Sequence, residues 1–273
     1  VSDRNNWWNL FRVDQSTNDM DLIPLTNIEA EIGLPQWVFG QSRYVFVGDE
    51  IWLAYREAGI DNLATLLPDG RLEKIEIDAT EIESVTNYQD GIVATVSSWK
   101  AESLVTFVNR KEIRPLSKTR DLGIDENWFP VPETFTYQTS DSEKAHALFY
   151  SPTNPEYEIS EKEKPPLIVL AHGGPTAAAR RQLQLSITYW TSRGFGVADV
   201  DYRGSTGYGR SFRNRLRNSW GLADVEDCVS VAKYLVEQKK VDKNKLAIKG
   251  GSAGGFTVLA ALTFHDTFTA GAS

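Results

Sequence analysis

The feature that most restricts the fold of this chain is a segment that matches itself, without a gap, at an offset of 41 residues. Both copies contain short β-type runs separated by turn residues such as Pro68-Asp69-Gly70. Aligned pairs include Asp49 and Asp90, Ile51 and Ile92, Leu63 and Leu104, Thr65 and Thr106, and Leu72 and Ile113. A period of about 40 to 45 residues that holds four short strands is typical of a β-propeller blade.

A β-sandwich with coincidental spacing is the alternative, but the shared aspartate turn and the ungapped register favour the propeller. Residues 10–25 repeat the third and fourth strands of the unit, so residues 1–122 would hold about two and a half blades, whereas a closed ring needs about four to eight. The chain opens on Val1, has its single methionine at Met20, and ends in the apolar stretch 269–273. We therefore expect an internal fragment of a longer protein.

The pattern changes at about residue 130. A hairpin is expected over residues 133–138 and 145–150, followed by a charged, proline-containing connection over 151–166. Apolar strands are then expected at 167–171, 196–200 and 246–248. They alternate with a helix over 181–193 and with a second helix that Asp224 is expected to cap. Strands alternating with helices predict a mostly parallel, doubly covered sheet.

A glycine-rich turn lies between the last of these strands and an Ala- and Leu-rich helix. It reads Gly250-Gly-Ser252-Ala-Gly254-Gly255. Strand, sharp turn and helix with a serine at the apex form the nucleophile elbow of α/β-hydrolases, in which small residues two before and two after the serine let strand and helix approach. A flexible linker does not fit these flanks. A dinucleotide loop would need glycine in place of Ser252, and a Walker loop would end in Gly-Lys-Ser/Thr. We predict that Ser252 is a nucleophile.

A second glycine motif, His172-Gly173-Gly174-Pro175-Thr176, directly follows a buried strand. Acyl transfer builds negative charge on a carbonyl oxygen and needs two fixed hydrogen-bond donors there. The expected donors are the backbone amides of Ala253 and Gly174. A tight turn at a strand end is the simpler explanation of Gly-Gly-Pro, but its co-occurrence with the elbow argues against it.

The three histidines are poor candidates for the base of Ser252. Hydrolases with this elbow carry their three catalytic residues in the chain order Ser, Asp, His, and only a short stretch of this chain follows Ser252. We expect His172 to shape the glycine loop and His146 and His265 to be packing or surface residues. The catalytic Asp and His would then lie outside this chain.

The net charge, the length of the apolar runs and the cysteine content argue against some classes of partner and compartment. The net charge is −8 and no basic stripe stands out, which argues against nucleic-acid binding. Apolar runs near the elbow are far shorter than the roughly 20 residues that span a bilayer, so no membrane partner is expected. Cys228 is the single cysteine. It is expected to be a buried small hydrophobe, and its isolation suits a reducing, cytoplasmic compartment.

The motifs together resemble the prolyl oligopeptidase family, in particular its acylaminoacyl-peptidases and dipeptidyl aminopeptidases. The likeness covers roughly residues 130–273. Besides the two glycine motifs it rests on three segments, namely Asp201-Tyr-Arg-Gly-Ser-Thr-Gly-Tyr-Gly-Arg-Ser-Phe212, Trp220-Gly, and Asp224-Val-Glu-Asp-Cys228. The resemblance implies a serine peptidase that acts on short peptides, without metal or cofactor, with Ser252 as nucleophile and Gly174 and Ala253 as oxyanion donors. Gly173, Gly250 and Gly254 would support these loops. Other branches carry tyrosine where this chain has His172.

The predicted fold is a partial β-propeller over residues 1–122 followed by the N-terminal part of an α/β-hydrolase domain over 123–273. An esterase or lipase-like hydrolase shares both glycine motifs and stays an alternative, as does a non-catalytic propeller scaffold. Assembly into a homo-oligomer also stays open. The chain by itself is expected to be inactive and to expose an unpaired edge at its last strand.

Overall fold

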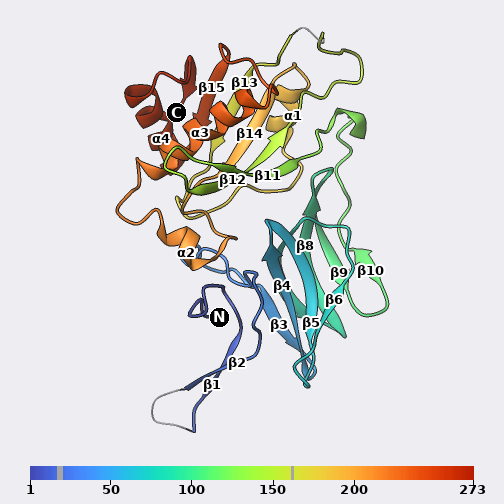
Figure 1. The fold of residues 1–273 in the computed structure, drawn as a ribbon. Helices are drawn as coiled ribbons and strands as arrows, with labels where there is room; N and C mark the ends of the chain where they lie inside the picture. The colour runs from blue at the N-terminus through green and yellow to red at the C-terminus, as the bar shows by residue number, and fades with distance from the viewer. Residues whose placement is uncertain (17–20, 161–162) are drawn as a thin grey trace. The chain divides into compact units, whose positions relative to one another are not determined.

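A computed structural model describes residues 1–16, 21–160 and 163–273 of the chain (Figure 1). The chain forms two compact units. The first contains Val1–Asp121 together with two later segments, Arg180–Leu183 and Thr206–Ser211. The second contains Leu122–Ala179, Gln184–Ser205 and Phe212–Ser273. Two short pieces of the later sequence thus pack with the first unit.

The first unit consists of antiparallel sheets. Strands β1 (Phe11–Asp14) and β2 (Asp21–Pro24) form a pair. One four-stranded sheet contains β3 (Tyr44–Val47), β4 (Glu50–Glu57), β5 (Ile60–Leu66) and β6 (Leu72–Ile75) in sequential order. The other contains β7 (Glu81–Tyr88), β8 (Gly91–Ser98), β9 (Ala101–Val108) and β10 (Ile113–Pro115), also in sequential order.

The two four-stranded sheets reproduce the repeat seen in the sequence. Three equivalent strand pairs begin 41 residues apart, at Glu50 and Gly91, Ile60 and Ala101, and Leu72 and Ile113. Alternate residues of both sheets share one core. Its buried members are Trp52, Ala54, Leu63, Ile82, Val85, Ile92, Ala94 and Val108. Each copy of the repeat therefore forms one sheet whose apolar face packs against the other copy.

The second unit is built on a six-stranded mixed sheet in the order β11-β12-β14-β13-β15-β16. Its strands are β11 (Glu133–Gln138), β12 (Lys144–Tyr150), β13 (Leu167–Ala171), β14 (Gly196–Asp201), β15 (Leu246–Gly250) and β16 (Ala270–Ala272). The pairs β13–β14, β13–β15 and β15–β16 are parallel, and the two pairs that involve β12 are antiparallel. Strand β13 is a continuous apolar run, and every residue of β14 is buried although the strand contains Asp199 and Asp201, so both strands lie at the buried centre.

Helices cover both faces of this sheet. The buried residues of α3 (Ala223–Glu237) and α4 (Ala253–Phe264) pack with alternate residues of β13 and β14 in one core. Ile187 of α1 (Leu185–Thr191) packs with Leu148 and Val197 on the opposite face. The short helices η1 (Glu126–Trp128) and α2 (Gly209–Asn214) lie in connections. Within the described ranges, no helix is both long and apolar enough to cross a membrane.

The structure corrects several expectations. The helix expected over 181–193 begins only at Leu185, because the Leu183 N–H donates to Ser98 O at 2.7 Å instead. Asp224 lies inside the first turn of α3, not at its cap. The basic stretch over residues 203–217 was expected to be a surface loop plus one helical turn; α2 supplies the turn, but residues 203–207 are buried. Strand β16 was not predicted; it pairs with β15 and is one of the two edge strands of the described sheet, with β11 at the other edge. The connection over 151–166 includes residues 161 and 162, where the prediction lies outside the described residues.

Candidate active site

Ser252 lies between the end of β15 and the start of α4. Its backbone has φ 54° and ψ −123°, a conformation that residues with a side chain rarely adopt. Such a backbone costs about 1–3 kcal/mol and persists only where the surrounding structure enforces it. The residue is exposed. The fold therefore holds this hydroxyl outside the core at the cost of local strain.

Two glycines allow the strand and the helix to meet at this turn. A Cβ at Gly254 would lie 2.0 Å from the Ala171 carbonyl oxygen, and a Cβ at Gly250 would lie 2.5 Å from the Gly254 carbonyl oxygen. Both neighbours are backbone atoms, which cannot rotate away. The requirement for small residues on either side of Ser252, inferred from the sequence, thus has a direct steric basis.

The loop that follows β13, residues 172–179 and hereafter the post-β13 loop, lies beside Ser252. A Cβ at Gly173 would be 3.4 Å from Ser252 Cβ and 3.9 Å from its Oγ. Gly174 has φ 123°, and a Cβ there would meet the Ala177 backbone nitrogen at 2.7 Å, so only glycine fits. Ala253 is the first residue of α4, where backbone N–H groups have no partner within the helix. The structure thus brings Gly173 of this loop against the serine turn. Gly174 directly follows Gly173 in the chain, and Ala253 directly follows Ser252.

His172 is a structural element of the post-β13 loop. Its ring stacks on Tyr202 with centroids 4.2 Å apart, and the Tyr202 hydroxyl donates to the His172 carbonyl oxygen at 2.8 Å. Nδ1 lies 2.7 Å from Gly173 O and Nε2 lies 2.7 Å from Ser205 Oγ. Burial lowers the pKa of the imidazole, so the ring is neutral near pH 7. Both ring nitrogens are engaged within the loop region, which is an arrangement suited to shaping the loop.

Buried carboxylates hydrogen-bond to the segments around the post-β13 loop and the serine turn. Asp201, at the end of β14, accepts the Ala179 N–H at 2.6 Å. Burial, followed by the charge of Asp201, raises the pKa of neighbouring Asp199 to about 7. Asp224 accepts the Gly221 N–H at 2.6 Å and the Thr257 hydroxyl at 2.5 Å, which joins α3 to α4 behind the serine turn.

The segment after β14 is fixed by an ion pair. The carboxylate of Asp227, on α3, accepts the Arg203 backbone N–H at 2.6 Å and its Nε–H at 2.9 Å. Sequence reasoning assigned no role to Asp199, Asp201, Arg203 or Asp227. For Asp201, Arg203 and Asp227 the only signal was membership in the Asp201–Phe212 and Asp224–Cys228 motifs, and Asp199 lies outside both. Cys228 is buried as expected, and burial raises the pKa of its thiol.

The arrangement is that of an α/β-hydrolase, in which a serine on a strained strand-to-helix turn lies above a mostly parallel sheet. Residues 181–273 match the model of the prolyl oligopeptidase family. The resemblance to this family that the sequence motifs indicated is therefore confirmed over these residues.

Curated relatives and solved structures agree with this assignment. Dipeptidyl aminopeptidase BIII of Pseudoxanthomonas mexicana is 36% identical over 107 residues, 39% of this chain and 16% of that protein. The acylamino-acid-releasing enzyme of Rattus norvegicus is 30% identical over 160 residues, 57% of this chain and 20% of that enzyme. A puromycin hydrolase structure is 35% identical with a TM-score of 0.94, and the match covers 98% of this chain and 41% of that one. The chain thus spans well under half the length of the relatives it matches.

Proposed function

We propose that this chain is part of a serine peptidase that cleaves short peptides through an acyl-enzyme on Ser252. The observation that carries the proposal is the exposed, strained Ser252 between β15 and α4, with Gly173 packed beside it. This turn lies within the residues that match the prolyl oligopeptidase family. Relatives named as dipeptidyl aminopeptidase and acylamino-acid-releasing enzyme support peptides as the substrate class.

In the proposed reaction, Ser252 Oγ forms a bond to the carbonyl carbon of the substrate as its proton moves to a base. The negative charge on the carbonyl oxygen is stabilised by the backbone N–H groups of Ala253 and Gly174. The intermediate collapses, the C–N bond breaks, and the leaving amine takes the proton. Water then attacks the ester to release the acyl group.

The base is proposed to be a histidine oriented by an aspartate, both beyond residue 273. In hydrolases with this elbow these groups follow the serine in chain order. Within the chain, His172 has both ring nitrogens engaged by Gly173 and Ser205. Because both nitrogens already have partners, His172 is assigned to the loop and not to proton transfer.

For the architecture, we propose that residues 1–122 contribute blades to a β-propeller and residues 123–273 the N-terminal part of an α/β-hydrolase domain. The four-stranded sheets that recur at 41 residues support the propeller. In such a protein a ring of blades would admit only short peptides to the active site. An esterase with an open site would lack this restriction on substrate size.

The test uses the full-length protein that contains this chain. A fluorophosphonate probe should label the wild type and fail to label Ser252→Ala. Labelling of the wild type excludes the non-catalytic scaffold, and its absence would refute the nucleophile assignment. Turnover of acyl-amino-acid anilides and peptidyl anilides should exceed that of simple alkyl esters relative to their uncatalysed rates. The opposite preference would support an esterase.

A further inference from the structure

Strand β11 is an edge strand of the six-stranded sheet, and part of its backbone points away from that sheet. In the turn that joins β11 to β12, the Thr139 N–H donates to the Glu143 carbonyl oxygen at 2.9 Å. Antiparallel strands alternate between hydrogen-bonded and non-hydrogen-bonded pairs, so Tyr137 directs its N–H and C=O toward β12, whereas Thr136 and Gln138 direct theirs outward. Both of these residues are exposed. In the part of the chain that the structure describes, β11 pairs with β12 alone, so these outward groups have no strand partner there.

The edge of β11 has none of the features that commonly prevent an exposed strand from pairing, which are proline, lysine and a bulge. Its sequence, Glu-Thr-Phe-Thr-Tyr-Gln, contains no proline or lysine, and its register with β12 runs without interruption from Glu133 to Gln138. Threonine, phenylalanine and tyrosine all favour β-strands. A regular, exposed edge of this composition is therefore a template for one further strand.

A groove of about 670 Å³ lies between this edge and helix α3. Residues 136–138 line it on the strand side, and one face of α3 that includes Tyr234 lines it on the helix side. The Tyr234 ring lies 5.3 Å from the ring of Phe135 and 6.1 Å from the ring of Tyr137. These two strand residues flank Thr136, so the middle of β11 lies beside the second half of α3.

Two opposite charges, one helical turn apart on α3, also line the groove. They are Lys233 and Glu237, which are both exposed. Neither forms an ion pair with any residue in the described ranges. In a contact with two-fold symmetry, residue i of one copy meets residue j of the other, and j meets i. Two antiparallel copies of α3 would therefore place Lys233 of each copy opposite Glu237 of the other.

We propose that β11 pairs with β11 of a second copy of this chain, antiparallel and about a two-fold axis, so that the two sheets join edge to edge. The axis places Thr136 opposite Thr136 of the second copy, and these two residues exchange backbone hydrogen bonds. Phe135 then lies opposite Tyr137 of the second copy, on the face covered by α3, which makes two cross-strand aromatic pairs. The same axis brings the two α3 helices antiparallel across the groove and pairs Lys233 with Glu237.

A second copy fits this surface better than an unrelated peptide because one symmetry axis satisfies all of its features. An extended peptide could also hydrogen-bond to the outward groups of Thr136 and Gln138. Nothing in such a peptide is fixed to match both charges of α3, whereas in the symmetric pair each charge has its complement one helical turn away.

The proposed contact leaves the candidate active site open. In the sheet order β11-β12-β14-β13-β15-β16, three strands separate β11 from β15, which carries the serine turn. With strands about 4.8 Å apart, the paired edge lies about 19 Å from β15. The association is therefore independent of the reaction proposed above, and it should be the same in Ser252→Ala as in the wild type.

The first test measures self-association of the full-length protein by sedimentation velocity over an about 100-fold range of concentration. Thr136→Pro removes the outward N–H and keeps the ladder with β12, because that N–H does not point toward β12. Its matched control is Thr136→Ala, which keeps the N–H but loses the hydroxyl that lies 2.9 Å from His146 Nδ1. The dissociation constant of the dimer should rise about tenfold or more in Thr136→Pro and stay within about threefold in Thr136→Ala.

The second test reverses the α3 charges without changing the strand. Glu237→Lys places lysines opposite each other across the axis, and Lys233→Glu places glutamates there, so each should raise the dissociation constant about tenfold. The double variant Lys233→Glu/Glu237→Lys restores opposite charges and should return to within about threefold of the wild type. Both residues are exposed, so the variants should keep the wild-type stability. Added salt should weaken the wild-type dimer.

Amide hydrogen exchange over residues 134–139 separates self-pairing from other ways of covering the edge. Exchange there should be slow in a concentrated wild-type sample and faster after dilution. A monomer in which these amides exchange slowly at every concentration would show that another segment of the full-length protein pairs with β11, and would overturn the proposal. A monomer in which they exchange rapidly would also overturn it, because the edge would then be left for a different protein.

The charge variants decide the question if Thr136→Pro fails to fold. A wild-type dimer whose dissociation constant is unchanged in Glu237→Lys and Lys233→Glu would place the interface elsewhere and overturn the proposal. If the wild type dimerises as expected but a fluorophosphonate probe does not label Ser252, the proposed function has failed and the contact through β11 stands.

Discussion

Replacement of Gly254 by alanine is expected to disrupt the serine turn measurably. The new Cβ would lie 2.0 Å from the Ala171 carbonyl oxygen, 2.7 Å from the Ala171 carbonyl carbon and 2.8 Å from the His172 carbonyl oxygen. Ordinary contact begins at 3.4 Å, so α4 and the end of β13 must separate by about 1.4 Å. All three atoms belong to the backbone, which leaves no side chain to move aside.

The expected magnitude follows from two opposing effects. Overpacking of this kind costs about 1–3 kcal/mol, and the upper end applies because the obstructing atoms are backbone. Alanine in place of glycine within a helix recovers at most about 1 kcal/mol. The free energy of unfolding should therefore fall by about 2 kcal/mol. Because Ser252 and Ala253 begin the displaced helix, kcat of the full-length protein should fall by about 100-fold.

The assay is urea denaturation together with peptidyl anilide turnover. Gly251→Ala serves as the stability control, since a Cβ at Gly251 would have no atom within 4 Å and its φ is not positive. The control should unfold within about 0.5 kcal/mol of the wild type. A Gly254→Ala protein with unchanged unfolding free energy and unchanged kcat would refute the steric argument.

Three further predictions follow from the second unit and its candidate site. Asp199 has a pKa raised to about 7, mainly by burial, so the folded state binds a proton that the unfolded state has released above its ordinary pKa of 3.8. The free energy of unfolding therefore falls as pH rises from about 4 to 7. Asp199→Asn should stabilise the protein by up to about 4 kcal/mol at pH 8 and leave it unchanged at pH 4. A difference in unfolding free energy between variant and wild type that does not change with pH would contradict this. Arg203→Met leaves the buried Asp227 without its cationic partner, with only the backbone N–H of residue 203 still donating to it, and should destabilise by about 3–5 kcal/mol in urea titrations. A loss below about 1 kcal/mol would show that the ion pair is not needed. Residues 1–273 produced alone should show no peptidase activity and should aggregate, because α4 exposes Phe256, Leu259 and Phe264 next to the open edge of β16; a monodisperse, active sample would contradict this.

The sequence alone determined the features that depend on local spacing. The 41-residue repeat specified two equivalent four-stranded sheets, because side-chain alternation and turn residues act over a few positions. The serine turn could also be predicted, since Gly250 must let β15 meet the start of α4, although the contact that excludes a side chain at Gly254 is with Ala171, on a strand distant in the sequence. The strained backbone at Ser252 follows from the same local constraint.

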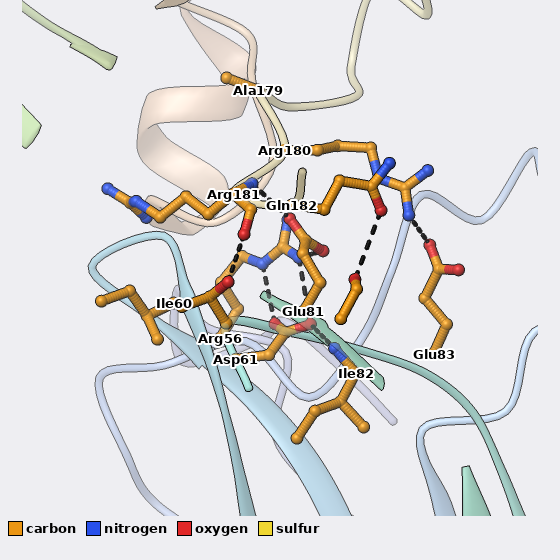
Figure 2. Close-up of polar contacts among 12 residues, drawn as sticks. Arg56, Ile60, Asp61, Glu81, Ile82, Glu83, Ala179, Arg180, Arg181 and Gln182 are labelled. Atoms are coloured by element: carbon orange, nitrogen blue, oxygen red, sulfur yellow. Dashed lines mark hydrogen bonds and ion pairs between the residues drawn. The ribbon is translucent and has the colours of Figure 1, made fainter. Parts of the chain in front are cut away.

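Only the tertiary structure decided where charged residues and connecting segments lie. Residues 181–183 have a helical pattern, yet their backbone hydrogen-bonds to distant strands, which a local pattern does not encode. No local pattern in the sequence marks Glu31 or Glu81 as buried. They are buried because each finds N–H donors about 100 or more positions away, at Arg181 (Figure 2) and at Gly207. A buried carboxylate is stable only with such partners, and the partners are brought together by the fold.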